Sequence, residues 1–128
     1  MTRNKFEKIV AEEFPRAVPE KFMNRIKNVA FVVESELSSL LRREQGLKSN
    51  ETLLGFYHGV PATHRGDNYG VGPIAPDKIV LFQKPIEEVS GGSEGTLRRV
   101  VRDTIWHEVA HYFGFSEEGV RRREKGLN

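Results

Sequence analysis

Hydrophobic residues recur at helical spacing through the last third of the chain. Leu97, Val101, Ile105, Val109 and Tyr112 follow one another every three or four positions, which places them on one face of an α-helix. The arginines of this stretch occupy another face and stop before position 104. The pattern predicts a long helix whose second half is enclosed by the rest of the fold.

The enclosed half of this helix carries ionisable side chains. Apolar residues surround it on nearly every side, and the polar exceptions are His107, Glu108 and His111. Burying such groups is costly unless they share a partner. The two histidines lie one helical turn apart, so both imidazoles can reach one metal ion. Glu108 beside them can hold a metal-bound water and take its proton.

A third metal ligand is expected just beyond the helix. Gly114 is well placed to end the helix in a left-handed turn, after which the chain doubles back toward the histidines. Glu117 then falls where longer motifs of this kind place their third ligand. Glu118 is an alternative ligand. A plain explanation also exists, because an acid following an N-cap such as Ser116 favours a helix start without any metal.

The remaining hydrophobic and breaker residues predict a mixture of helices and strands. Asn4 with Glu7 resembles a capping box for a first helix, which we expect to end at Pro15, and Pro19 suits the first turn of a second helix. The further elements expected are a buried strand at 30–33, a segment at 34–48 that is either a short helix or a surface connection, a strand at 52–57, a long loop at 59–77, a strand at 78–82, a flexible hinge at 90–93 and a last helix from about 116 to 125.

The residues around the two histidines and two further segments resemble those of a known family. The pattern H-E-x-x-H-x-x-G-x-x-E at 107–117, with the segments LGFYHGVP at 54–61 and IVLFQKPIE at 79–87, resembles the minimal zincin-like metallopeptidases, a family of small bacterial proteins. The resemblance runs from about Leu53 to Glu118. It implies a compact α+β domain, with a small mixed sheet, flanking helices and a central helix carrying the motif. It also implies a zinc peptidase with His107, His111 and Glu117 as metal ligands and Glu108 as general base.

Composition narrows the remaining possibilities. A chain of 128 residues predicts one domain over 1–128, and a net charge of +2 with mixed signs demands neither nucleic acid nor membrane as partner. Clusters such as Arg98-Arg99 are interpreted as solvated helix faces. The absence of cysteine leaves histidine and carboxylate as metal donors. The N-terminus lacks the apolar core of a signal peptide, so we expect a cytoplasmic monomer. Because Met1 and Met23 are the only methionines, no methionine-turn can follow the helix, and a full metzincin is excluded.

Several side chains outside the motif have two possible roles. His64, Arg65 and Tyr69 in the long loop, and His58 before it, could each steady an oxyanion, or be exposed loop residues. Asp103 is either a carboxylate that orients the first histidine or an ordinary surface residue. The strand at 78–82 either lies at the sheet edge, where a peptide could pair with it, or lies inside the sheet.

Three hypotheses on function follow from these residues. The first is a zinc peptidase acting on peptides or unfolded protein. The second is a metal-stabilised module that binds a partner peptide with little or no turnover, which the small size of the chain favours. The third is a helix with a chance motif, which would require another way to satisfy two buried histidines.

Overall fold

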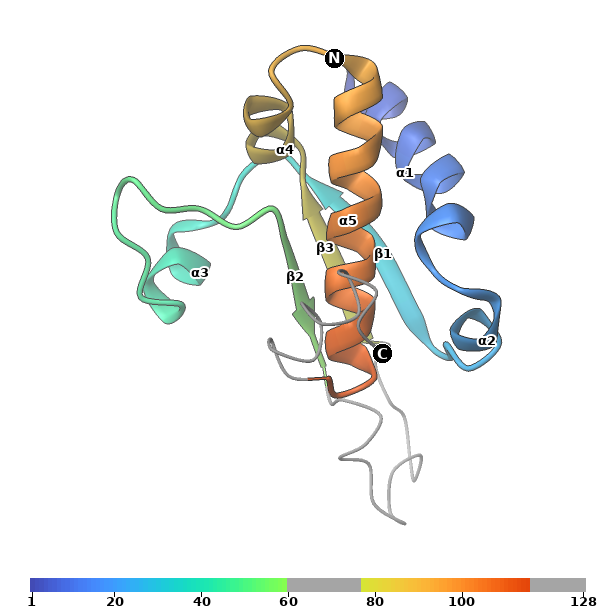
Figure 1. Cartoon of the computed structure of the whole chain (residues 1–128). Coiled ribbons are helices and arrows are strands. Elements are labelled where there is room, and N and C mark those ends of the chain that lie inside the picture. The colour runs from blue at the N-terminus through green and yellow to red at the C-terminus, as the bar shows by residue number, and fades with distance from the viewer. Residues whose placement is uncertain (60–76, 116–128) are drawn as a thin grey trace.

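A computed structural model of the chain describes residues 1–59 and 77–115. In this part of the chain, helices pack on one small β-sheet (Figure 1). The elements in order are α1 (Arg3–Ala17), α2 (Glu20–Met23), β1 (Val29–Glu34), α3 (Ser39–Glu44), β2 (Gly55–His58), β3 (Asp77–Phe82), α4 (Gln83–Ser90) and α5 (Glu94–Tyr112). The predicted α+β class with flanking helices is confirmed. That residues 1–128 form a single domain stays a prediction.

The sheet is mixed, as expected, and its strand order is β1-β3-β2. β3 pairs with β1 in parallel and with β2 antiparallel. The strand at 78–82 therefore lies inside the sheet, which is the second of the two positions considered for it. Among the described strands, β2 is the one at the edge next to the histidine-bearing helix.

Helix α5 is the element on which the others converge. It packs against α1, α4, β2 and β3, and in Figure 1 it runs along the sheet between α1 and β2. Its stripe of apolar residues is fully buried, as the spacing predicted. The core comprises Phe6, Ile9, Val10, Val18, Phe22, Val33, Ile79, Leu81, Ile86, Leu97, Val101, Ile105 and Val109.

The boundaries of α1 differ from those expected. The N-cap is Thr2, whose hydroxyl accepts a hydrogen bond from the Lys5 amide at 3.1 Å, so the capping box at Asn4 is wrong. The helix also passes through Pro15 and ends at Ala17. Proline removes one backbone donor. The continuation to Ala17 places this residue and Val18 against the core, which offsets that loss.

Helix α4 was not predicted. Pro85 lies in the first turn of α4, where proline is tolerated because the amides there have no helical partner. In the segment 90–93, Ser90 ends α4 and the next three residues form a tight turn into α5. The flexibility expected for this segment stays a prediction. Gly91 closes α4 at φ 64°, and the Ser93 hydroxyl caps α5 by accepting from the Thr96 amide at 3.3 Å.

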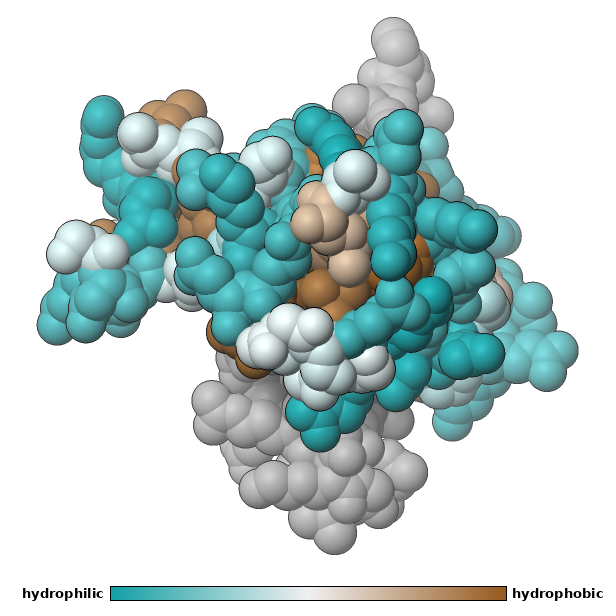
Figure 2. Space-filling view, turned by 90° about the horizontal axis from the view of Figure 1, so that it is seen from above, coloured by the Kyte–Doolittle hydropathy of each residue, from teal (hydrophilic) through white to brown (hydrophobic). Residues whose placement is uncertain are grey.

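The segment 34–48 contains the short helix α3, the first of the two alternatives. None of its residues is buried, and Ser38 caps it. In Figure 1 and in the view from above in Figure 2, this segment stands out from the body of the molecule. Most of its surface is hydrophilic in Figure 2. It therefore adds little to the core.

A buried carboxylate joins α1 to the first half of α5. Glu13 is completely buried and accepts hydrogen bonds from Arg98 at 3.0 Å and from Arg102 at 2.8 Å. Burial would raise the pKa of Glu13, but these hydrogen bonds, with the positive charges of Arg102 and Arg16, outweigh it and lower the pKa. The interpretation of Arg98 as part of a solvated face is therefore wrong. The arginines hold two helices together.

Candidate functional site

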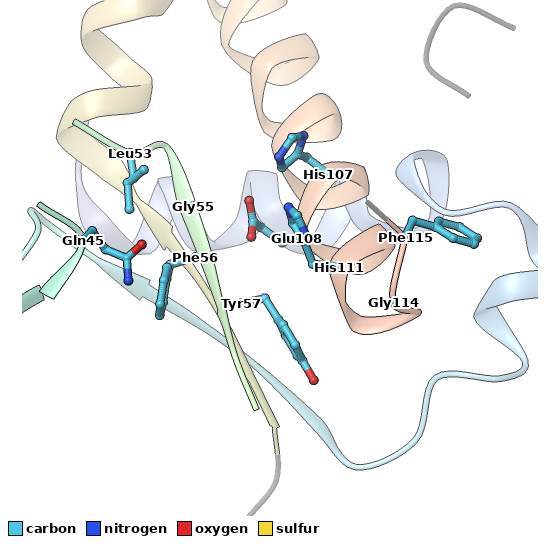
Figure 3. A pocket seen from close by; sticks show the side chains of 10 residues that line it. All are labelled: Gln45, Leu53, Gly55, Phe56, Tyr57, His107, Glu108, His111, Gly114 and Phe115. Atoms are coloured by element: carbon cyan, nitrogen blue, oxygen red, sulfur yellow. The ribbon is translucent and has the colours of Figure 1, made fainter. Parts of the chain in front are cut away.

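The last turns of α5 bring the predicted catalytic and metal-binding side chains to one side of the helix. His107, Glu108 and His111 all point toward β2 (Figure 3). The two imidazole rings have centroids 4.9 Å apart and planes inclined at 69°. Glu108 is buried, whereas both histidines are half-buried. The helix thus presents two nitrogen donors and one carboxylate toward a single space.

The separation of the two rings suits a shared metal ion. Zinc binds imidazole nitrogen at about 2.0–2.1 Å with tetrahedral angles, which holds two ring centroids roughly 5 Å apart. The observed 4.9 Å agrees with that arrangement. With no cysteine in the chain, imidazole and carboxylate are the donor types available, and both are accepted by zinc.

Gly55 allows β2 to pass close to these side chains. A Cβ atom at this position would lie 2.8 Å from Cγ2 of Thr104 and 3.2 Å from Cγ of Glu108, closer than ordinary contacts. Only glycine therefore fits without a shift of the strand or the helix. Since successive strand residues face opposite sides, Gly55 and Tyr57 both face α5, and the Tyr57 ring meets the Tyr112 ring edge-on at 6.1 Å.

A cleft of about 450 Å³ opens between β2 and the end of α5. Its lining, drawn in Figure 3, consists of Gln45, Leu53, Gly55, Phe56, Tyr57, His107, Glu108, His111, Gly114 and Phe115. Sequence reasoning missed Gln45 and Tyr57. The alternation along β2 could have identified Tyr57. Gln45 depends on how the α3 segment folds back toward the cleft, for which no local signal exists.

Tyr57 is held in place by Asp77. Its hydroxyl donates a 2.7 Å hydrogen bond to Oδ2 of the Asp77 carboxylate, at the start of β3. Asp77 also leaves no room for a side chain at Gly59, where a Cβ would lie 2.4 Å from its Cγ. The wall of the cleft at the end of β2 is therefore fixed to the central strand.

The helix ends at a left-handed glycine, as predicted. Gly114 has φ 82°, its amide donates to the His111 carbonyl at 2.9 Å, and the Phe115 amide donates to the Ala110 carbonyl at 3.0 Å. This is the double hydrogen bond of a Schellman motif, which satisfies carbonyls that the helix leaves open. The ring of the following residue, Phe115, meets the Phe22 ring edge-on, with centroids 6.0 Å apart.

Comparison with known families agrees with this geometry. A family model described as zincin-like metallopeptidase matches residues 26–127, most of the chain. The chain belongs to the zincin-like metallopeptidase family. The matched region includes all three strands and α5, whereas α1 precedes it. The ion pairs of Glu13 therefore join α5 to a helix outside the matched region. A search of curated proteins found no match.

The two candidates for the third metal ligand, Glu117 and Glu118, lie outside the described residues. Within 1–59 and 77–115, no group of three or more histidine, aspartate or glutamate side chains is arranged to hold a metal ion. His107, His111 and Glu117 therefore stay predictions as a ligand set, as does Glu108 as the base.

The side chains considered for stabilising an oxyanion or orienting a histidine have different outcomes. His64, Arg65 and Tyr69 lie outside the described residues. His58 is exposed and lies on the face of β2 opposite to α5, beside Phe56. Asp103 is exposed, and no hydrogen bond joins it to His107, so the orienting role is not supported.

In the part of the chain that is described, no helix has the length and hydropathy needed to cross a bilayer.

Proposed function

We propose that this protein is a zinc-dependent peptidase that cleaves extended peptides or unfolded protein segments. The observation that carries the proposal is the convergence of His107, Glu108 and His111 on a cleft beside an edge strand, in a chain of the zincin-like metallopeptidase family. No nucleic acid or membrane is needed for this activity, and we propose a cytoplasmic monomer.

The histidines would hold the metal, with Glu117 or Glu118 as third ligand. When bound, zinc would polarise the peptide carbonyl and make a water molecule more acidic. All remaining steps belong to side chains and backbone of this chain. The imidazoles orient the site, because α5 fixes their rings on one side of the helix.

Glu108 would move the proton. Its carboxylate oxygen would take a proton from the attacking water and deliver it to the amine nitrogen of the leaving peptide. The position of Glu108 suits this role because it is buried at the cleft, next to Gly55 of the edge strand. A peptide in the cleft would thus lie within reach of the carboxylate.

Strand β2 would hold the substrate. Among the described residues β2 pairs with β3 along one edge, and an extended peptide would add as a further strand along the other edge. Pairing with such an edge supplies main-chain hydrogen bonds that do not depend on sequence. Extended or unfolded segments would therefore bind, whereas folded proteins would not.

The test compares wild type with Glu108→Gln after zinc loading. We expect stoichiometric zinc in both proteins, chelator-sensitive cleavage of an unfolded protein by wild type, and cleavage about 10²- to 10⁴-fold slower in the variant. Glu7→Gln removes the same charge from an exposed position on α1 and serves as control. Zinc binding without cleavage in wild type would favour the binding module instead. A folded protein that takes up no zinc would contradict both.

A further inference from the structure

A second hollow continues the cleft along α5 toward its N-terminus. Both hollows are lined by Leu53, Gly55, His107 and Glu108, so they form one continuous surface. The second hollow, which we call the lateral groove, lies between α4, the first half of α5 and the chain entering β2. Its further lining residues are Thr52, Leu54, Val89, Val100, Asp103 and Thr104.

The walls of the lateral groove are aliphatic and accessible. Leu53, Leu54 and Val100 are half-buried, and Val89 is 56% exposed, one of the few large hydrophobic side chains so exposed in the described residues. Uncovered aliphatic surface next to a cleft is well suited to contact part of a ligand. The groove therefore offers apolar contact beside the proposed catalytic residues.

Asp103 gives the lateral groove a negative charge. It is exposed, and no hydrogen bond or ion pair is found for it among residues 1–59 and 77–115. Among the described residues, the other charged residue of the lining is Glu108, and neither lysine nor arginine lines the groove. Aliphatic walls with an acidic rim are complementary to a long cationic side chain, whose stem is apolar and whose end is charged.

We propose that the lateral groove is a specificity subsite for a lysine or arginine side chain of the substrate, with Asp103 as the residue that recognises its charge. The inference rests on the proposed peptidase function. The stem would pack on Leu53, Val89 and Val100, and the cationic end would stay in water beside the carboxylate. An acidic side chain would be repelled, and a purely apolar one would gain the wall contacts alone.

The topology also places this side chain relative to the cut bond. β2 and α5 both run antiparallel to β3 and so run in the same direction, as Figure 1 shows. The lateral groove lies at the start of both elements, and the rest of the cleft lies toward their ends. A peptide pairing antiparallel with β2, the more stable arrangement, would run the opposite way. Its residues after the scissile bond would therefore reach the groove.

Matched peptides test the subsite. Internally quenched peptides carry lysine, norleucine or glutamate at the first or second position after the scissile bond, and norleucine keeps the stem of lysine without its charge. Wild type should cleave the lysine peptide about three- to fivefold faster than the norleucine peptide, the upper part of the range of a solvent-exposed ion pair. Asp103→Asn should bring this ratio to about one, and Asp103→Lys should favour glutamate over lysine. Glu7→Gln, an equal charge change on α1, should keep the wild-type ratio.

Equilibrium binding separates this inference from the proposed function. If zinc-loaded wild type cleaves none of the peptides, the peptidase proposal fails, and the same peptides are then titrated against zinc-loaded Glu108→Gln protein by fluorescence anisotropy. Tighter binding of the lysine peptide, lost when Asp103→Asn is added, would still support the subsite. Norleucine cleaved or bound as well as lysine, a lysine preference that survives Asp103→Asn, or no binding at all would overturn it.

Discussion

The two halves of α5 use ionisable residues in opposite ways. In the first half, Arg98 and Arg102 face α1 and are matched by the buried carboxylate of Glu13 at 3.0 and 2.8 Å. In the second half, His107 and Glu108 face β2 and line a cleft. One continuous apolar stripe supports both halves, since Val101, Ile105 and Val109 are all completely buried.

This difference separates stability from chemistry along a single helix. The arginines of the first half, Arg98 and Arg102, bond to side chains of α1, so their contribution should be to the free energy of unfolding. The side chains of the second half point into a space that a ligand can enter, so their contribution should be to binding and turnover. Substitutions in the two halves should consequently have different signatures.

The largest effect is expected from His107→Ala. A ligand that binds only the folded protein stabilises it by about 2.7 kcal/mol when its concentration is 100 times the dissociation constant. At that zinc concentration, the free energy of unfolding of wild type should rise by about 2.7 kcal/mol, and that of the variant should not change. Urea unfolding with and without zinc, together with metal analysis, measures both. A variant that keeps the zinc-dependent gain would show that His107 is not a ligand.

Glu13→Gln should lower stability without affecting zinc. The substitution leaves Arg98 and Arg102 without their buried counter-charge, and we expect a loss of about 2 kcal/mol, below the value for a fully buried pair because both arginines are about one-third exposed. Urea unfolding measures the loss, with Glu7→Gln as the control. Zinc stoichiometry should equal that of wild type. Loss of zinc in a folded Glu13→Gln protein would contradict the division between the two halves.

The same carboxylate predicts a dependence on pH. Because the pKa of Glu13 is lower in the folded protein than its ordinary value of 4.5, its contribution is fully present above that value and is lost as the pH falls through the lowered pKa. The stability difference between wild type and Glu13→Gln should therefore be constant near neutral pH and shrink below 4.5. Urea midpoints measured across this range test it. A difference that grows on acidification would mean that the folded-state pKa is raised.

The sequence predicted the long helix and the placing of both histidines on one side of it, because both follow from the spacing of nearby residues. The helix from Leu97 to Tyr112 and its end at Gly114 were both predicted from residues close together in the sequence. The structure agrees with both predictions. The mixed sheet followed from the family resemblance and is confirmed. Glu117 as third ligand lies beyond the described residues and stays a prediction.

The partners of charged residues could not be predicted from local spacing. Arg98 and Glu13 are far apart in the sequence, and nothing near either residue indicates that α1 packs beside α5. Helix α4 was missed for a different reason, since Pro85 is compatible with the end of a strand as well as with the first turn of a helix. Tertiary contact decided both cases.

The smallest effect is expected at Gly55 of β2, which lies against α5 where its two halves meet. Gly55→Ala places a Cβ atom 2.8 Å from Thr104 and 3.2 Å from Glu108, so either β2 or α5 must shift. We expect overpacking to cost about 1 to 2 kcal/mol. Peptide cleavage should fall further than this loss of stability alone explains, because the shift moves the strand that would hold the substrate relative to the carboxylate.

Gly95→Ala is the matched control for this substitution. Gly95 lies in the first turn of α5, where a Cβ atom would meet nothing closer than 3.9 Å, and alanine there should stabilise the helix by up to about 1 kcal/mol. Unfolding and cleavage are measured for both variants at the same zinc concentration. If Gly55→Ala lost stability but cleaved peptides at the wild-type rate, the close approach of β2 to Glu108 would serve packing alone. The catalytic role would then belong to the second half of α5 alone, without a contribution from β2.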